Sequence, residues 1–360
     1  VPPTAVSLLI HWRKVMNESD LVRKHYNFTG RLKDVVNWSG ISTSDVLFIA
    51  VCCFIILENA MVLLTIWRTK KFHKPMFYFI GNLAFLDLLS GISYITNILL
   101  SGSYTFKLTP TEWFVREGSV FVALTASVIS LLAIAVERYL TMIKMQLQSS
   151  GKTWRAFLII GICWVIAAFF GSMPIMGWNC IDRMSSCSTV LPLYHKTYIL
   201  FCISLFTLIL MTIVALYIRI YVIVQSHGRN LAVNKAPNDH SDKLSEKSHA
   251  LLRTVIIVLS CFITCWTPLF IIFAVDVVCD TGKCQILYEL KWFLALAVLN
   301  SAMNPLIYMF TSKQIRSAFL RLLPCASWTW PNGKSMIANE LISKSDSSQC
   351  QKDKPDGNES

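Results

Sequence analysis

Apolar residues fall in seven long blocks along the chain, and short polar segments separate the blocks. Each block reaches the ~20 residues that a helix needs to cross the hydrocarbon core of a bilayer. Because lipid offers the backbone no hydrogen-bond partners, each block is predicted to be a helix. The pattern therefore predicts an all-α membrane protein, a seven-transmembrane-helix bundle. The predicted spans are Asp45–Trp67, Met76–Leu100, Trp113–Lys144, Trp154–Met176, Tyr194–Val224, His249–Val278 and Ile286–Phe310.

The third block carries a carboxylate beside an arginine at each end. Arg116 and Glu117 precede an uncharged stretch, and Glu137 and Arg138 follow it. At 1.5 Å per residue, the two carboxylates lie ~30 Å apart along a helix, which is about the thickness of the hydrocarbon core. We expect the first pair to recognise a ligand on one side of the membrane and the second pair to face a partner on the other.

The composition, 54% hydrophobic and 15% charged, excludes an ordinary soluble domain. The formal net charge of +12 does not indicate nucleic acid, because the basic residues gather in alternate connections between the blocks. The positive-inside rule places those connections in the cytoplasm and the N-terminus outside, as in a multi-pass plasma-membrane protein. The basic residues are Arg68, Lys70, Lys71, Lys74, Lys144, Lys152, Arg155, Arg229, Lys235, Lys243, Lys247, Arg253, Lys313, Arg316 and Arg321.

Four regions are predicted from this pattern. They are an extracellular cap over 1–44, the seven-helix domain over 45–310, an amphipathic helix with an acylation site over 311–325, and a disordered cytoplasmic tail over 326–360. Three glycosylation sequons, at Asn17, Asn27 and Asn37, all fall in the first region. Within the second region, the polar stretch Pro237–Glu246 is predicted to be a mobile loop.

The amphipathic helix is expected to run from Lys313 to Leu323. Cys325 follows it, where S-acylation would add a second hold on membrane lipid; the alternative is an unmodified thiol. Serines in the tail are candidate phosphorylation sites; they are Ser343, Ser345, Ser347 and Ser348.

Four cysteines lie in predicted outer loops, where oxidation is allowed. Cys180 and Cys187 share one loop, and Cys279 and Cys284 share another, so two short loop-closing disulfides are expected, with free thiols as the alternative. The other cysteines of the spans are expected to pack as small apolar residues; they are Cys52, Cys53, Cys163, Cys202, Cys261 and Cys265.

Asp87 lies in the middle of the second block, where an ionisable group is costly and calls for a function. With Asn300 and Ser301 it is a candidate site for a small cation, namely sodium; the alternative is a hydrogen-bond network between helices that holds no ion. A proton relay is not favoured, because we expect no second buried carboxylate at that depth. Further polar residues expected at this depth are Asn59, Ser127, Ser130 and Asn304.

Prolines are predicted inside three helices, at Pro174, Pro268 and Pro305. Each removes a backbone donor and clashes with the carbonyl four residues back. Kinks of this kind beside polar residues are candidate hinges for movement of helix halves, although a single proline is more often a static kink.

Taken together, the motifs resemble the rhodopsin-like G-protein-coupled receptors. The resemblance covers Asp45 to Cys325 and rests on Asn59, Asp87, Glu137-Arg138-Tyr139, Trp164, Cys265-Trp266-Thr267-Pro268 and Asn304-Pro305-Leu306-Ile307-Tyr308. It implies that heterotrimeric G proteins dock near Arg138, that Trp266 senses ligand and that Tyr308 rearranges on activation. It also implies that receptor kinases and arrestin bind the serine-rich tail, and that the chain is not an enzyme.

A narrower resemblance is to the sphingosine 1-phosphate receptors of the lysophospholipid group. It rests on Arg116-Glu117, on the stretches Phe79–Asp87, Trp178–Cys180 and Cys187–Tyr194, and on the lack of a cysteine at the outer end of the third block. The chemistry fits, because a phosphate needs a fixed cation and an ammonium needs a carboxylate. The alternative is that Arg116 and Glu117 only pair with neighbours at the membrane interface.

The same resemblance assigns the rest of the ligand site. The segment His25–Arg31 is expected to cap the bundle, with Tyr26 and Arg31 contacting phosphate and Asn97 and Ser101 near the headgroup. A capped mouth suggests that the lipid enters sideways from the bilayer, and the role of Lys291 is open. The residues expected along the acyl chain are Phe121, Leu124, Phe206, Trp266, Leu269 and Phe270.

Three other classes are weighed against this interpretation. Lysophosphatidic acid receptors resemble the chain too, but typically carry Gln at the position of Glu117, since their ligand has a hydroxyl in place of the amine. A receptor for a neutral lipid would leave Arg116 and Glu117 without a charged headgroup. A seven-helix transporter or pump is disfavoured, because the chain shows no internal repeats and no lysine deep in the last span.

Overall fold

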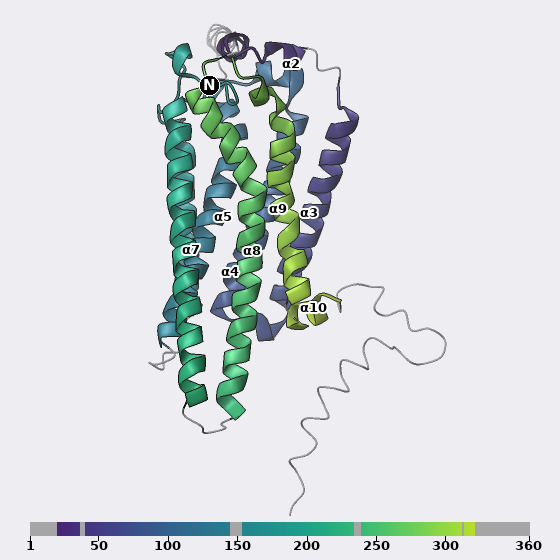
Figure 1. Ribbon diagram of the computed structural model, residues 1–360. Helices are drawn as coiled ribbons and strands as arrows, with labels where there is room; N and C mark the ends of the chain where they lie inside the picture. Colours follow the sequence, from purple (N-terminus) through teal and green to yellow (C-terminus); the bar gives the residue numbers. More distant parts are fainter. Residues whose placement is uncertain are drawn as a thin grey trace, which may run out of the picture.

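Seven long helices pack side by side in the computed structural model (Figure 1), which describes residues 20–36, 40–144, 153–233, 239–281, 283–311 and 313–320. Asn17, Asn37, Cys325 and the tail serines lie outside the described residues. Seven helices are long and apolar enough to cross a membrane. They are α3 (Thr43–Arg68), α4 (Pro75–Leu99), α5 (Pro110–Lys144), α6 (Thr153–Ser172), α7 (Lys196–Val233), α8 (Asp239–Val278) and α9 (Leu290–Thr311).

The predicted spans are confirmed, and local sequence explains where several of the helices begin. Ser42 and Asp45 form a capping box at the start of α3, since each side chain accepts the other's backbone N–H. Thr109 and Glu112 do the same at the start of α5. Pro75 takes the first position of α4, where the missing N–H costs nothing.

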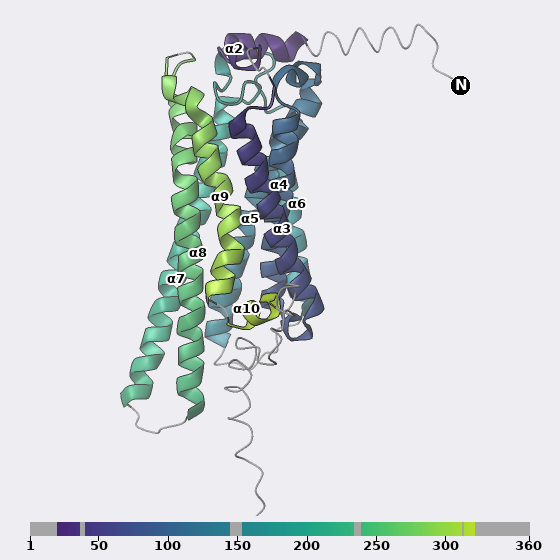
Figure 2. The same cartoon turned by 90° about the vertical axis from the view of Figure 1, so that its right-hand side faces the viewer.

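Two expectations about helix ends are wrong. Helix α6 ends at Ser172, so Pro174 lies in the turns after it and does not kink it. Most of the polar stretch Pro237–Glu246 is helical, because α8 begins at Asp239. In Figure 2, α7 and α8 continue beyond the other helices at the end that carries the short α10. Pro268 and Pro305 do lie inside helices, α8 and α9.

Helix α5 lies at the centre of the bundle and packs against α4, α6 and α7. The outer surface of the bundle is far more apolar than that of a soluble protein. Apolar side chains such as Val165 and Leu208 face outward, while Asn59, Asp87 and Asn300 are buried. This distribution matches a bundle surrounded by lipid, where polar groups are satisfied only against other helices.

A cap closes one end of the bundle, called the cap end below; the opposite end is the α10 end (Figure 2). The cap comprises a helix over 20–28 and α2 (Leu32–Val36). Val22 and Tyr26 are buried, and the Tyr26 ring meets Phe106 edge-on in the 3₁₀ helix η2 (Gly102–Lys107). The remaining 3₁₀ helices are η1 (Lys70–Phe72), η3 (Met184–Ser186) and η4 (Gln285–Glu289).

Both expected disulfides are present at the cap end, Cys180–Cys187 and Cys279–Cys284. Buried His25 lies with the two sulfurs of the first bridge, all three ligand-type atoms within 4.8 Å. Because both sulfurs are bonded to each other, they offer no thiolates to a metal. The arrangement is therefore packing of the cap against the loop between α6 and α7.

Helix α10 (Lys313–Leu320) lies across the opposite end of the bundle (Figure 1). Ile315 and Phe319 are buried and the helix packs against α9 and α3, which confirms an amphipathic helix over Lys313–Leu320. A turn of four residues separates Ile315 from Phe319, so both side chains lie on one side of the helix.

Candidate functional site

Arg116 and Glu117 meet as an ion pair near the cap end of α5. Arg116 donates from Nη2 and Nε to Glu117 Oε1, at 2.7 and 3.1 Å. Its Nη1 donates to the Leu100 carbonyl at 2.8 Å and to Thr105 Oγ1 at 3.1 Å. The end of α4 and the η2 turn therefore hold the guanidinium, which is buried.

Asn97 brings α4 against the carboxylate of this pair. Its Nδ2 donates to Glu117 Oε2 at 3.4 Å, and Ser101 Oγ donates to the Asn97 carbonyl at 2.6 Å. The expected grouping of Asn97, Ser101, Arg116 and Glu117 is therefore present. The pair is self-neutralised, and a ligand bearing both a phosphate and an ammonium offers each member a replacement partner.

The two cap residues assigned to the headgroup have different surroundings. The Tyr26 hydroxyl accepts from Trp113 Nε1 at 3.1 Å, beside Arg116. Burial raises the pKa of Tyr26 above its usual range, and the positive charge of Arg116 opposes that shift. Arg31 donates instead to the Thr189 and Leu287 carbonyls, at 2.7 and 2.6 Å.

The side chains expected along an acyl chain form an aromatic cluster below the pair. Phe206 and Phe270 stack with ring centroids 3.9 Å apart, and Trp266 lies 6.1 Å from Phe270. Phe121 contacts Tyr194 and Phe273. Leu269 is buried in the same core. These apolar side chains pack against one another in the interior of the bundle.

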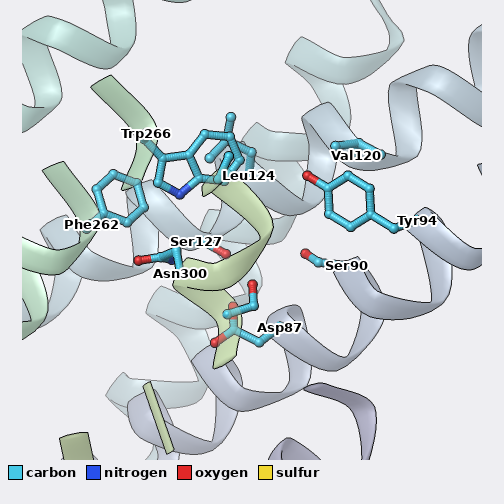
Figure 3. A pocket seen from close by; sticks show the side chains of 11 residues that line it. Asp87, Ser90, Tyr94, Val120, Leu124, Ser127, Phe262, Trp266 and Asn300 are labelled. Carbon is cyan, nitrogen blue, oxygen red and sulfur yellow. The ribbon is translucent and has the colours of Figure 1, made fainter. Parts of the chain in front are cut away.

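A small polar cavity lies beneath the cluster, with room for about one water molecule, ~10 Å³ (Figure 3). Asp87, Asn300 and Ser301 line it together with Ser127, while Leu124 and Trp266 form its apolar wall. Carboxylate, amide and hydroxyl oxygens are the ligands that a hard cation prefers. The residues assigned to sodium are therefore brought together.

The other polar residues of this region have partners among the helices. Asn304 Nδ2 donates to Asp87 Oδ2 at 2.8 Å, and Asn59 Nδ2 donates to the Ser301 carbonyl at 3.1 Å. Ser130, which was expected near the cavity, accepts from Asn82, and Trp164 Nε1 donates to the same amide. Part of the predicted pocket is therefore a network that ties α4, α5 and α6.

Two buried carboxylates were missed by the sequence interpretation. Glu58 on α3 is buried and interacts electrostatically with Asp87, so the expectation of no second carboxylate near that depth is wrong. Asp276 is fully buried at the cap end of α8. The sequence contains a signal for both residues, because an acidic side chain inside an apolar span is costly and calls for an explanation.

The second charged station lies at the α10 end of α5. Arg138 is partly exposed and interacts electrostatically with Tyr217 of α7 and with Glu137. Its Nε has no hydrogen-bond partner within the part of the chain that the structure describes. Tyr139 is packed against the core, and Tyr308 and Pro305 are buried on α9.

Comparison with known proteins gives these features a family. The model of the 7 transmembrane receptor (rhodopsin family) matches residues 58–308. The chain is 61% identical to sphingosine 1-phosphate receptor 1 of Danio rerio, over 94% of this chain and 95% of that protein. It is 50% identical to sphingosine 1-phosphate receptor 3 of Takifugu rubripes, over 84% and 78%. With human sphingosine 1-phosphate receptor 2 it shares 44%, over 84% and 83%. The chain therefore belongs to the rhodopsin family of seven-transmembrane receptors and, within it, to the sphingosine 1-phosphate receptors.

Proposed function

We propose that this chain is a plasma-membrane receptor that binds sphingosine 1-phosphate at Arg116 and Glu117 and activates heterotrimeric G proteins. The observation that carries the proposal is the ion pair between buried Arg116 and partly exposed Glu117, 2.7 Å from Nη2 to Oε1, on adjacent residues of one helix. The ligand phosphate binds the Arg116 guanidinium in place of Glu117. The ligand ammonium binds the Glu117 carboxylate in place of Arg116, beside Asn97. A ligand with phosphate but no amine leaves Glu117 without a cationic partner, with only Asn97 donating to it, which is costly for a carboxylate in a poorly hydrated site.

The acyl chain supplies the step from binding to signalling. It displaces Phe206 and Phe270, which stack on each other, and Phe270 lies next to Trp266. Trp266 in turn forms part of the wall of the cavity at Asp87, and it lies on α8, the helix that contains Pro268. The ligand therefore favours one arrangement of α8 over another, and G protein that binds the same arrangement raises the affinity for the ligand.

The α10 end is the cytoplasmic side in this proposal, and the cap end is extracellular. The basic connections Arg68–Lys74 and Arg155 support that orientation, as does the exposed sequon at Asn27. G protein binds near Glu137, Arg138 and Tyr139. Sodium binds at Asp87, Asn300 and Ser301, while Cys325 carries an acyl group and the tail serines bind arrestin after phosphorylation by receptor kinases.

Binding of two lysophospholipids to matched variants tests the headgroup assignment. Glu117→Gln should weaken sphingosine 1-phosphate binding by about 10- to 100-fold, the range of a charge-assisted hydrogen bond, and should weaken lysophosphatidic acid binding little. Glu112→Gln is the control, because it is the same change on the same helix and Gln still caps the helix start. Unchanged sphingosine 1-phosphate affinity in Glu117→Gln, at normal surface expression, would show that the assignment is wrong.

A further inference from the structure

Asp276 is a buried carboxylate that the ligand site and the G-protein site leave unused. It lies near the cap end of α8 and its side chain is fully buried. Its Oδ1 accepts the Thr189 backbone N–H at 2.8 Å, and its Oδ2 accepts a short hydrogen bond from Ser188 Oγ. Hydrogen bonds to a buried charge are roughly twice as strong as neutral ones. Asp276 therefore fixes the loop between α6 and α7 to α8.

Arg31 of the cap binds the other side of the same loop residue. Its Nε donates to the Thr189 carbonyl at 2.7 Å, while its Nη2 donates to the Leu287 carbonyl at 2.6 Å. Tyr288 closes the contact, since its hydroxyl donates to the Thr29 carbonyl at 3.0 Å and its ring lies 5.5 Å from the guanidinium. A single connected network thus joins α8, the loop, the cap and η4.

Opposite charges bind the two backbone groups of Thr189. The Asp276 carboxylate accepts its N–H, and the Arg31 guanidinium donates to its carbonyl. Hydrogen bonds arranged in a chain polarise one another, and in a buried setting the loss of either end leaves a polar group unsatisfied. Loss of Asp276 should therefore weaken the hydrogen bond of Arg31, and the reverse, because the backbone of Thr189 connects the two side chains.

We propose that Asp276 and Arg31 are a positioning pair that clamps the cap over the headgroup site through Thr189. The clamp holds the cap so that Tyr26 stays against Trp113 and Arg116. Arg31 contributes to the clamp through its Nε and Nη2, which donate to the backbone carbonyls of Thr189 and Leu287. The effect on ligand rests on the headgroup site proposed above, whereas the effect on the cap does not.

Two substitutions separate a clamp from a direct phosphate contact. Arg31→Lys keeps the positive charge but replaces the planar fork by a single ammonium that cannot span two carbonyls. Asp276→Asn alters the other end of the clamp and leaves the charge of Arg31 in place. If Arg31 contacted only the ligand phosphate, Arg31→Lys would release ligand at a near-normal rate and Asp276→Asn would not change the rate of dissociation. The clamp predicts that both variants release ligand faster.

The experiment measures dissociation of labelled sphingosine 1-phosphate and amide hydrogen exchange over 20–36 in the full-length receptor. Each single variant should dissociate about tenfold faster and expose the cap amides, while the α5 amides stay protected. The double variant should be no faster than either single variant, which a merely additive loss of stability would not produce. Asp280→Asn, an exposed acid that pairs with Lys283, is the matched control.

If Asp276→Asn fails to reach the cell surface, Ser188→Ala is a milder variant, because it removes one hydrogen bond from the same carboxylate. It should give a smaller increase in ligand dissociation and in amide exchange of the cap. Normal cap protection in Arg31→Lys and in Asp276→Asn or Ser188→Ala would overturn the clamp. Faster dissociation with a protected cap would also overturn it, because Arg31 would then act on the ligand itself. If the unaltered receptor bound no sphingosine 1-phosphate, the headgroup proposal would fail, and the hydrogen exchange would still test the clamp.

Discussion

The two charged stations of α5 hold the same two kinds of side chain in opposite conditions. At the cap end, the Arg116 guanidinium has partners in Glu117, Leu100 and Thr105. At the α10 end, Arg138 is partly exposed, and its buried Nε has no hydrogen-bond partner among the described residues. A satisfied pair has to be opened by a ligand that supplies both charges. A buried donor without a partner is instead stabilised by an acceptor that arrives from outside.

The largest expected effect is at the second station. Arg138→Ala should lower agonist-stimulated nucleotide exchange by at least ~100-fold, because it removes a charged donor that meets G protein. Sphingosine 1-phosphate binding should persist, since Arg138 lies at the far end of α5. Arg155→Ala, an exposed arginine at the start of α6, serves as the control. Near-normal exchange by Arg138→Ala would break the comparison between the two stations.

The next largest effect, at the first station, tests whether phosphate binding needs the shape of the Arg116 guanidinium as well as its positive charge. Arg116→Lys keeps the positive charge, but a single ammonium cannot reach Glu117, Leu100 and Thr105 together as the guanidinium does. Affinity for sphingosine 1-phosphate should fall by about tenfold, and nucleotide exchange at saturating ligand should stay normal. Full affinity in Arg116→Lys would mean that the phosphate needs charge alone.

Asp87 lies between the two stations and tests whether they are linked. Asp87→Asn removes the charge that a cation needs, while Asn304 can still hydrogen-bond the new amide oxygen. Sodium should lower agonist affinity severalfold in the unaltered receptor and leave Asp87→Asn unaffected, as linkage requires for an ion that favours one state. Agonist titrations in sodium and in potassium make the measurement. Equal sodium sensitivity in the two proteins would assign the cavity to a network without an ion.

The spans and the polar positions of this bundle could be predicted because they depend on composition along single helices. Arg116, Glu117 and Asp87 stand out in apolar surroundings, and Glu58 and Asp276 could have been found by the same argument. The clamp could not, because Arg31 binds backbone carbonyls 158 and 256 residues away, which leave no mark in the sequence. The prediction for the start of α8 is wrong for the opposite reason, since a polar stretch of sequence can be helical as readily as disordered.

The smallest expected effect concerns Tyr26, which connects the cap to the first station. Burial raises its pKa, so the folded cap keeps the phenol protonated where an open cap would begin to lose the proton. Closure is therefore fully favoured below the ordinary tyrosine value of ~10 and weakens as pH rises above it. Amide exchange over 20–36 should be level from about pH 6 to 9, once corrected for intrinsic exchange rates, and should increase beyond pH 10. Tyr26→Phe should remove the alkaline increase at the cost of one hydrogen bond, about 1 kcal/mol. An equal alkaline increase in Tyr26→Phe would place the titrating group elsewhere, and the cap would then be tied to α5 by packing against Trp113 and Phe106 alone.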